Sequence, residues 1–390
     1  MATKIEGFCA PGFESVRDVF AAHFDAGAEV GAAVAAEVDG RLVVDLWAGW
    51  ADQARTRPWT RDTLVNVYST TKGMTALCAQ RLADAGRLDL DAPVARYWPE
   101  FAAEGKGGIP VRWLLSHRAG LPAVRRPLPR EALFDFAAMA EALAAEAPWW
   151  TPGERHGYHV LSFGWLVGEV VRRVSGKSVG AYFREEIAGP LEADFHIGLD
   201  DAHHGRVAEM SAFAAPAPGA EPPPLVQLML RDPESAAARA FMNPPSMMEG
   251  PNHAAWRRAE IPGANGHATA RGVARIYGTL AAGGARDGVR VLSREGVARC
   301  REEQARGPDA VLLLSTRIGG GFMLPQPDVP NGHFGPGAGA FGHPGAGGSL
   351  GFADPESRVG FGYAMNRMGP EILVDPRPAA LIDALYEALG

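Results

Sequence analysis

Residues 69–72 read Ser69-Thr70-Thr71-Lys72, and they carry a hydroxyl and an amine three residues apart where an apolar run turns helical. On a helix, positions i and i+3 share one face, so the amine can reach the hydroxyl. Only four of the 38 Lys and Arg residues are lysines, so the chain uses arginine for ordinary cationic work. A desolvated lysine can lose its proton near neutral pH, whereas arginine cannot. This tetrapeptide is a weak motif by itself, but it suggests base chemistry at Lys72.

The surroundings of this stretch predict strands before it and a buried helix after it. Residues 32–38 and 42–47 are β-rich runs, and Asp39-Gly40 between them is typical of a tight hairpin turn. The residues after Ser69 continue with few charges to about Gly86, which predicts a buried helix that begins at Ser69. Unpaired backbone N–H groups at such a helix start favour developing negative charge.

The remaining chain is helical in the middle and rich in strands at its end. Helices are predicted at 13–24, 111–116, 131–146, 161–174, 179–187, 269–282 and 377–389, and strands at 310–316, 318–324, 347–353 and 359–365. We therefore expect an α/β (α+β) fold whose N- and C-terminal segments share one antiparallel sheet.

The expected domains follow from this order of elements. Residues 1–90 and 285–390 form the α/β domain, and residues 91–284 form a mainly helical domain inserted between them. The Ala/Pro-rich stretch at 212–224 reads as a surface loop or lid element of the helical domain.

Composition and charge exclude several classes of partner. The net charge is −7, the pI is near 5.9, and the arginines are scattered, so we expect neither a nucleic-acid nor a membrane partner. The three cysteines are odd in number and far apart, which argues against a disulfide framework or a thiolate metal site. Residues 1–12 lack the pattern of a secretory signal, and no apolar run is long enough to span a bilayer. The expected location is cytoplasmic.

A second serine competes with Ser69 for the role of nucleophile. Residues 347–351 read Gly-Gly-Ser-Leu-Gly and match the G-x-S-x-G elbow of α/β-hydrolases. That elbow requires a histidine after the serine, but all eleven histidines precede Ser349, the last being His343. A strand-like run follows instead of a helix. We therefore interpret these glycines as close backbone packing in a strand pair.

Three further motifs accompany Ser69-Thr70-Thr71-Lys72 along the chain. They are Trp113-Leu114-Leu115-Ser116-His117-Arg118-Ala119-Gly120-Leu121, the run from Pro152 through Tyr158 to Gly168, and His343-Pro344-Gly345. In this order the chain resembles the serine beta-lactamase and penicillin-binding-protein superfamily, particularly class C beta-lactamases and family VIII carboxylesterases. The resemblance implies an active site in the groove between the α/β domain and the helical domain.

The resemblance also implies roles for individual residues. Ser69 would be the acylating nucleophile, Lys72 its base or proton relay, and Tyr158 a third member whose phenol shares protons with both. The oxyanion hole would be formed by the backbone N–H groups of Ser69 and Ala346.

Other candidates follow around these residues. The candidates for substrate binding are His343, Gly345, His156 and Asn265. A structural role for His343 and a turn role for Asn265 stay open. His203-His204 lacks a third ligand at suitable spacing, so no metal is expected.

Two departures from the beta-lactamase pattern bear on the substrate. Val160 stands where that pattern has an Asn two residues after the tyrosine, and His343-Pro344 stands where it has Lys and a hydroxyl residue. Neither position offers the amide or the permanent cation that a penicillin would use. We therefore expect a serine carboxylesterase acting through an acyl-enzyme on small, short-chain acyl esters, with no cofactor.

The alternatives keep the same fold. They are beta-lactamase or D,D-peptidase-like activity, an amide hydrolase of the linear-oligomer type, and a non-catalytic scaffold.

Overall fold

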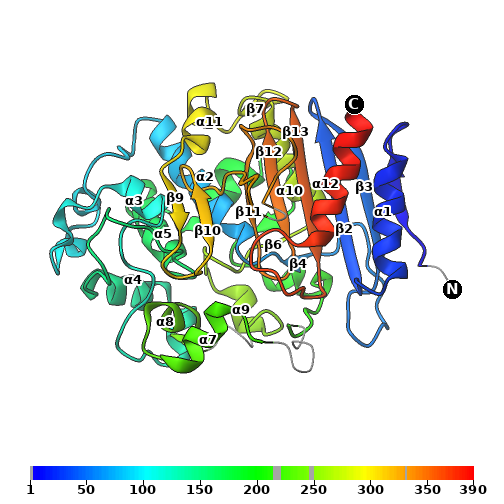
Figure 1. Ribbon diagram of the computed structural model, residues 1–390. Coiled ribbons are helices and arrows are strands. Elements are labelled where there is room, and N and C mark those ends of the chain that lie inside the picture. The colour runs from blue at the N-terminus through cyan, green and yellow to red at the C-terminus, as the bar shows by residue number, and fades with distance from the viewer. Residues whose placement is uncertain (1–2, 214–220, 246–249, 330–331) are drawn as a thin grey trace.

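The protein is described by a computed structural model that covers residues 3–213, 221–245, 250–329 and 332–390 (Figure 1). Most of the predicted loop at 212–224 lies outside these residues. Among the described helices, none is both long and apolar enough to cross a bilayer.

The centre of the fold is a six-stranded antiparallel sheet built from both ends of the chain. Its strands stand in the order β1-β3-β2-β13-β12-β11. Their bounds are Glu6–Cys9 (β1), Gly31–Val38 (β2), Arg41–Gly49 (β3), Phe341–Pro344 (β11), Leu350–Asp354 (β12) and Val359–Met365 (β13). The two halves meet where β2 pairs with β13, in a register that runs from Val38 opposite Val359 to Ala32 opposite Met365. The predicted shared sheet is confirmed, and so is the turn at Asp39-Gly40, where both residues have positive φ.

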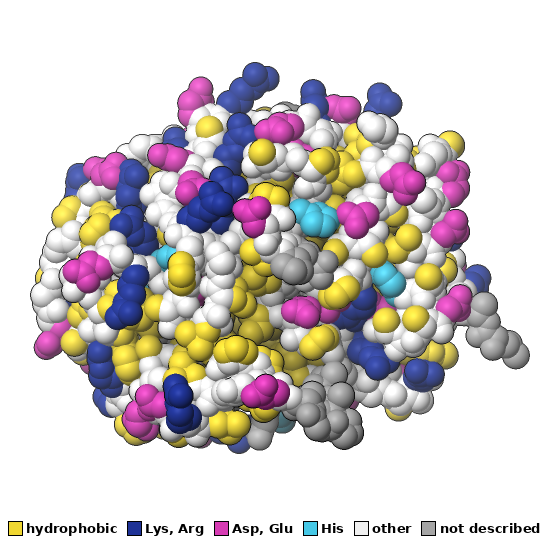
Figure 2. All heavy atoms as spheres, viewed as in Figure 1, with side chains coloured by type: hydrophobic (Ala, Val, Ile, Leu, Met, Phe, Trp, Pro, Cys, Tyr) yellow, Lys and Arg dark blue, Asp and Glu magenta, His cyan; other side chains and the backbone are white. Residues whose placement is uncertain are grey.

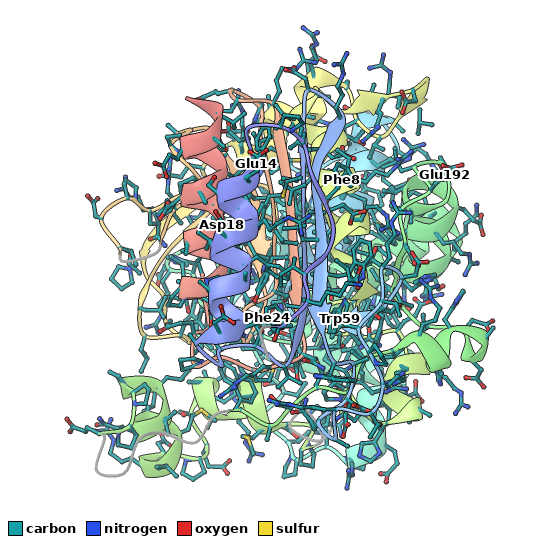
Figure 3. The ribbon with its side chains drawn as sticks, turned by 90° about the vertical axis from the view of Figure 1, so that its right-hand side faces the viewer. Phe8, Glu14, Asp18, Phe24, Trp59 and Glu192 are labelled. Atoms are coloured by element: carbon teal, nitrogen blue, oxygen red, sulfur yellow. The ribbon has the colours of Figure 1, made fainter. Side chains whose placement is uncertain are left out.

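Helices cover both faces of this sheet. α1 (Glu14–Asp25) and α12 (Pro376–Leu389) lie side by side on one face (Figures 1 and 3). Glu14 and Asp18 are exposed on α1, whereas Phe24 is buried. α10 (Ala270–Ala281) packs against β13 and β2.

Glycines on β13 allow α10 to approach the sheet closely. A Cβ on Gly360 would lie 2.1 Å from the backbone nitrogen of Gly278, and a Cβ on Gly362 would lie 2.2 Å from the carbonyl oxygen of Ala270. Larger side chains at either position would push the helix off the sheet.

α2 (Thr70–Asp84) is a buried helix that joins the sheet to the helical region. It contacts β11 on one side and α5 (Ser162–Ser175) and α6 (Val179–Phe183) on the other. Its burial explains why the sequence after Ser69 is poor in charge, because a helix packed all round must be apolar all round. The other α-helices of the described residues are α3 (Val111–Leu115), α4 (Phe136–Ala145), α7 (Pro224–Arg231), α8 (Ala236–Met242), α9 (Ala254–Arg258) and α11 (Arg294–Arg301).

Short strand pairs complete the fold. β4 (Val65–Asn66), β5 (Phe195–His196) and β6 (His267–Ala268) form a small sheet with β6 in the middle. β7 (Ala285–Arg286) pairs with β8 (Val289–Arg290), and β9 (Ala305–Pro308) pairs with β10 (Ser315–Ile318).

Several sequence predictions differ from the structure for identifiable reasons. The strand predicted at 310–316 is wrong, because Asp309 accepts hydrogen bonds from the N–H groups of Val311 and Leu312 and turns the chain there. The helix predicted at 131–146 breaks at Asp135, whose side chain caps α4 through the N–H of Ala138. The strand predicted from residue 347 starts only at Leu350.

The helix predicted at 269–282 exists but packs on the sheet, although the predicted domains assign it to the helical insertion. We therefore propose that the helical domain ends before α10. The division of the chain into two domains otherwise stays as proposed from the sequence.

Candidate active site

Ser69 lies at the start of α2, directly after a strained turn. Tyr68 has a φ of 41°, a conformation that residues other than glycine adopt only when the surroundings impose it. β4, two residues before Tyr68, pairs with β6, and the N–H of Val67 donates to the carbonyl of Gly266. These contacts fix the backbone that presents the Ser69 side chain.

Lys72 is fully buried, and its Nζ contacts three oxygen atoms. Nζ lies 3.1 Å from Ser69 Oγ and 2.7 Å from each of the carbonyl oxygens of Val160 and Gly263. It also lies 4.7 Å from the centre of the Tyr158 ring. Burial holds the pKa of Lys72 well below its usual range, because desolvation disfavours the charged ammonium. Among the described residues no carboxylate forms an ion pair with it.

Tyr158 is buried and lines the same pocket as Ser69. Burial raises the pKa of its phenol, and an interaction with the Ser69 side chain acts against this rise. Its hydroxyl lies 3.5 Å from Nε2 of His343. Both effects of burial, a lower pKa for Lys72 and a higher pKa for Tyr158, favour a neutral amine beside a neutral phenol.

His343 is buried at the end of β11 beside this phenol. Its Nδ1 lies 2.7 Å from the carbonyl oxygen of Pro344, so Nδ1 carries the proton and Nε2 is an acceptor that faces Tyr158. Burial lowers the pKa of His343 to about 3, so the ring is neutral near pH 7. A permanent positive charge is therefore absent from this position.

The loop after β11 carries Ala346 to the pocket that Ser69 lines. Ala346 and Ser69 both line the same pocket, and within the described residues neither backbone N–H donates to a protein acceptor. Gly345 lies behind them, because a Cβ there would stand 2.2 Å from Ser349 Oγ and 2.3 Å from the carbonyl oxygen of Val67. This geometry fits an oxyanion hole made by two free N–H groups.

The pocket in front of Ser69 is apolar and has a volume of about 310 Å³. None of the described residues that line it is charged. They are Tyr68, Ser69, Tyr158, Val160, Leu161, Phe213, Pro223, Leu225, Val226, Met229, Phe241, Ala264, Leu312, Met323, Pro344, Ala346, Pro370, Ile372 and Leu373. Figure 2 shows hydrophobic side chains gathered on this face of the molecule around α7 and α8.

None of the four predicted substrate-binding residues, His343, Gly345, His156 and Asn265, is among the described residues that line the pocket. The side chain of His156 lies 2.8 Å from Thr316 Oγ1. The side chain of Asn265 bonds only backbone groups, donating to the carbonyls of Trp256 and Ala259 and accepting from the N–H of Ile261. Asn265 therefore has the turn role, which shapes the loop that carries Gly263.

Ser349 is close to Ser69 in space but is turned away from the pocket. Its Oγ donates to the carbonyl of Val67 at 2.7 Å and lies 3.2 Å from Thr70 Oγ1. These two contacts support the backbone on either side of Ser69.

The described residues contain no cluster of His, Cys, Asp or Glu that could hold a metal ion. His203 and His204 contact Arg206 and Asp201, respectively.

Comparison with known proteins identifies the family. The beta-lactamase family model matches residues 16–385. The chain belongs to the beta-lactamase family.

Relatives within this family include esterases as well as lactamases. The esterase/beta-lactamase LipL of Mycobacterium tuberculosis is 41% identical over 380 residues, covering 95% of this chain and 85% of LipL. The crystal structure of a family VIII carboxylesterase is 44% identical with a TM-score of 0.89, covering 99% of this chain and 100% of that one. A penicillin-binding-protein homologue from Caulobacter crescentus is 42% identical with a TM-score of 0.90 over the same shares. The fold is therefore beta-lactamase/transpeptidase-like, as the motifs predict.

The sequence did not reveal the groups that position Lys72 and Tyr158. The carbonyls of Val160 and Gly263 that bind Lys72 are backbone atoms, so no side-chain motif marks them. Asp309, which accepts a hydrogen bond from the N–H of Tyr158 at 2.9 Å, lies 151 residues away in sequence.

Proposed function

We propose that the protein is a serine carboxylesterase that forms an acyl-enzyme at Ser69. The observation that carries this proposal is the hydrogen bonding of Lys72 Nζ to Ser69 Oγ and to two backbone carbonyls. The relatives that are named as esterases support the same conclusion.

A neutral lysine fits these three contacts. A neutral amine has two N–H donors and one lone pair, and the two carbonyls of Val160 and Gly263 use both donors. The lone pair is then left for the hydroxyl proton of Ser69, 3.1 Å away. Lys72 can therefore take that proton when Ser69 attacks.

The proposed reaction has two halves. Ser69 Oγ attacks the ester carbonyl carbon, its proton passes to Lys72, and the negative charge on the carbonyl oxygen is stabilised by the N–H groups of Ser69 and Ala346. The C–O bond to the alcohol then breaks, and the leaving oxygen takes a proton from Tyr158, which is replaced from Lys72. Water attacks the acyl-enzyme with the same groups acting in reverse.

The pocket favours uncharged, apolar ester substrates. A carboxylate on the substrate would lose its hydration without meeting a cation among the described lining residues. A beta-lactam antibiotic carries such a carboxylate, so its turnover should be poor. Small, short-chain acyl esters are the proposed substrates, and a cytoplasmic location is part of the proposal because all three cysteines are free thiols.

A panel of p-nitrophenyl esters with nitrocefin beside it tests the proposal. We expect turnover of acetate and butyrate esters that exceeds nitrocefin turnover, and labelling by a fluorophosphonate probe. Faster nitrocefin turnover would favour the beta-lactamase alternative. Failure of the probe to react would favour a non-catalytic scaffold.

A further inference from the structure

We infer that Asp309 is a positioning residue. It holds the proton-donating phenol of Tyr158 in place and fixes the position of one wall of the substrate pocket. This inference rests on the proposed esterase chemistry, in which Tyr158 protonates the leaving alcohol. It comes from a buried carboxylate that bonds the Tyr158 backbone directly.

One oxygen of this carboxylate holds three backbone groups. Asp309 is 2% exposed. Its Oδ1 accepts hydrogen bonds of 2.9 Å from the N–H groups of Tyr158, Val311 and Leu312. Among the described residues no Lys or Arg forms an ion pair with it, so these N–H groups and the Thr316 hydroxyl compensate for its lost hydration.

The other oxygen continues the network away from the site. The hydroxyl of Thr316 donates to Asp309 Oδ2 at 3.3 Å, and this hydroxyl lies 2.8 Å from Nε2 of His156. Because the hydroxyl proton is used by Asp309, the ring of His156 acts as the donor to Thr316. This network explains why His156 is buried here and not in the pocket.

Tyr158 depends on such contacts because it lies outside any helix or strand. Residues 154–159 form no regular element, so no ladder of backbone hydrogen bonds fixes the phenol. The N–H of Ala310 also donates to the carbonyl of His156, and the N–H of Gly157 donates to the carbonyl of His117. Asp309 is the only side chain among the described residues that bonds the N–H of Tyr158 itself.

The same carboxylate connects the phenol to the pocket wall. Leu312 lines the pocket, and its N–H shares Oδ1 with the N–H of Tyr158. Loss of this acceptor would release both groups together. The negative charge of Asp309 also adds to the burial that raises the pKa of Tyr158 and keeps the phenol protonated.

Two esters that share one acyl group provide the test. The leaving group of p-nitrophenyl butyrate is a stable phenolate, which needs little protonation. The leaving group of ethyl butyrate is an alkoxide, which must be protonated as it departs. The ratio of their kcat/KM values therefore reports proton delivery by Tyr158. Folding is checked for each variant by circular dichroism.

We expect Asp309→Ala to lower kcat/KM for ethyl butyrate about tenfold more than for p-nitrophenyl butyrate. Asp309→Asn should restore most of the loss, because the amide oxygen still accepts from the three N–H groups. In a Tyr158→Phe background, Asp309→Ala should not change the ratio further. If the role of Asp309 were merely structural, Asp309→Ala would lower kcat/KM equally for both esters in every background.

The matched control is Asp354, another buried carboxylate that caps backbone N–H groups. It accepts from the N–H groups of Glu356 and Ser357 and from the hydroxyl of Tyr386, at the end of β12 away from the 345–349 loop. Asp354→Ala should leave the substrate ratio unchanged.

A folded Asp309→Ala with an unchanged ratio would overturn the inference, and so would an Asp309→Asn variant as impaired as Asp309→Ala. If Asp309→Ala does not fold, Thr316→Val replaces it. That variant removes the Oδ2 donor and the partner of His156 Nε2 but leaves the three N–H bonds to Oδ1, and it should shift the ratio in the same direction by less. An unchanged ratio there also overturns the inference. A wild-type protein inactive on both esters and unreactive with a fluorophosphonate would instead refute the proposed function.

Discussion

Lys72 Nζ lies 3.1 Å from Ser69 Oγ, and its remaining hydrogen bonds go to two backbone carbonyls instead of a carboxylate. A buried ammonium is normally balanced by a negative charge. The absence of one among the described residues around Nζ favours the neutral amine, which is the form that can accept a proton from serine. The chemistry therefore depends on how α2 is buried as much as on the identity of the two residues.

Replacing this lysine by arginine should abolish the base. Lys72→Arg puts a permanent cation in place of the neutral amine and removes the titratable group, and we expect kcat/KM for p-nitrophenyl butyrate to fall at least about a thousandfold. Lys106→Arg is a matched control, because Lys106 Nζ is also buried against three carbonyls, those of Ala103, Ala144 and Glu146. Near-normal activity of Lys72→Arg would contradict the base assignment.

The second serine should be dispensable for chemistry. Ser349→Ala removes the hydrogen bond to the carbonyl of Val67, and a loss of about 1 kcal/mol in unfolding free energy is expected. Ester turnover should stay within a few-fold of wild type. Urea denaturation and steady-state kinetics on the same preparation separate the two effects, and a drop in kcat/KM comparable to that of Ser69→Ala would refute this role.

The apolar pocket should discriminate against charged acyl groups. We expect kcat/KM for p-nitrophenyl hemisuccinate to be at least about tenfold below that for p-nitrophenyl butyrate, because its carboxylate meets no cation there. Val226 lines the pocket from α7, so Val226→Arg should narrow this difference. Leu230→Arg, on an exposed side of the same helix, is the control and should leave the difference unchanged. Equal rates on both esters in the wild type would show that the pocket is not selective.

Buried histidines should make the protein less stable in mild acid. Burial lowers the pKa of His343 and His267 to about 3 and of His159 to about 4, and holds that of His117 well below its usual range. In the unfolded chain each of these histidines binds a proton near the reference pKa of 6.5, whereas in the folded chain it does not. The stability that is present above pH 6.5 is therefore lost as the pH falls. Burial raises the pKa of Glu29 to about 7, so the folded protein binds this proton more readily than the unfolded chain does. Protonation of Glu29 therefore stabilises the fold as the pH falls and offsets part of the loss.

The histidine effect is larger, because these four histidines and two further ones with a lowered pKa, His23 and His156, oppose the two carboxyl groups with a raised pKa, Glu29 and Glu37. From pH 7 to 5.5 the unfolding free energy should fall by roughly 3 kcal/mol. Urea denaturation at the two pH values measures the change, and His267→Asn, outside the pocket, should reduce it. A free energy that is constant or rises on acidification would contradict this account.

The sequence was sufficient to predict the sheet and the contact between Ser69 and Lys72, because both leave local patterns. The Asp39-Gly40 turn has positive φ at both residues, and the alternation of small and apolar residues marks β13 over 359–365. The S-x-x-K spacing works through helix geometry, which is the same in every α-helix.

The groups that hold the centre could not be predicted in this way. The carbonyls of Val160 and Gly263 are backbone atoms that any residue could supply, and a single Asp309 carries no motif. Asn265 illustrates the opposite error. A polar residue near the site invites a substrate role, but its side chain is fully used by backbone partners.

The most direct test of the central claim is the site of covalent attachment. The protein is incubated with a fluorophosphonate, digested, and analysed by peptide mass spectrometry. The account predicts one adduct on Ser69 in the wild type, its loss in Ser69→Ala, and slow labelling in Lys72→Arg. An adduct on Ser349, or labelling of Ser69 at the wild-type rate in Lys72→Arg, would contradict it.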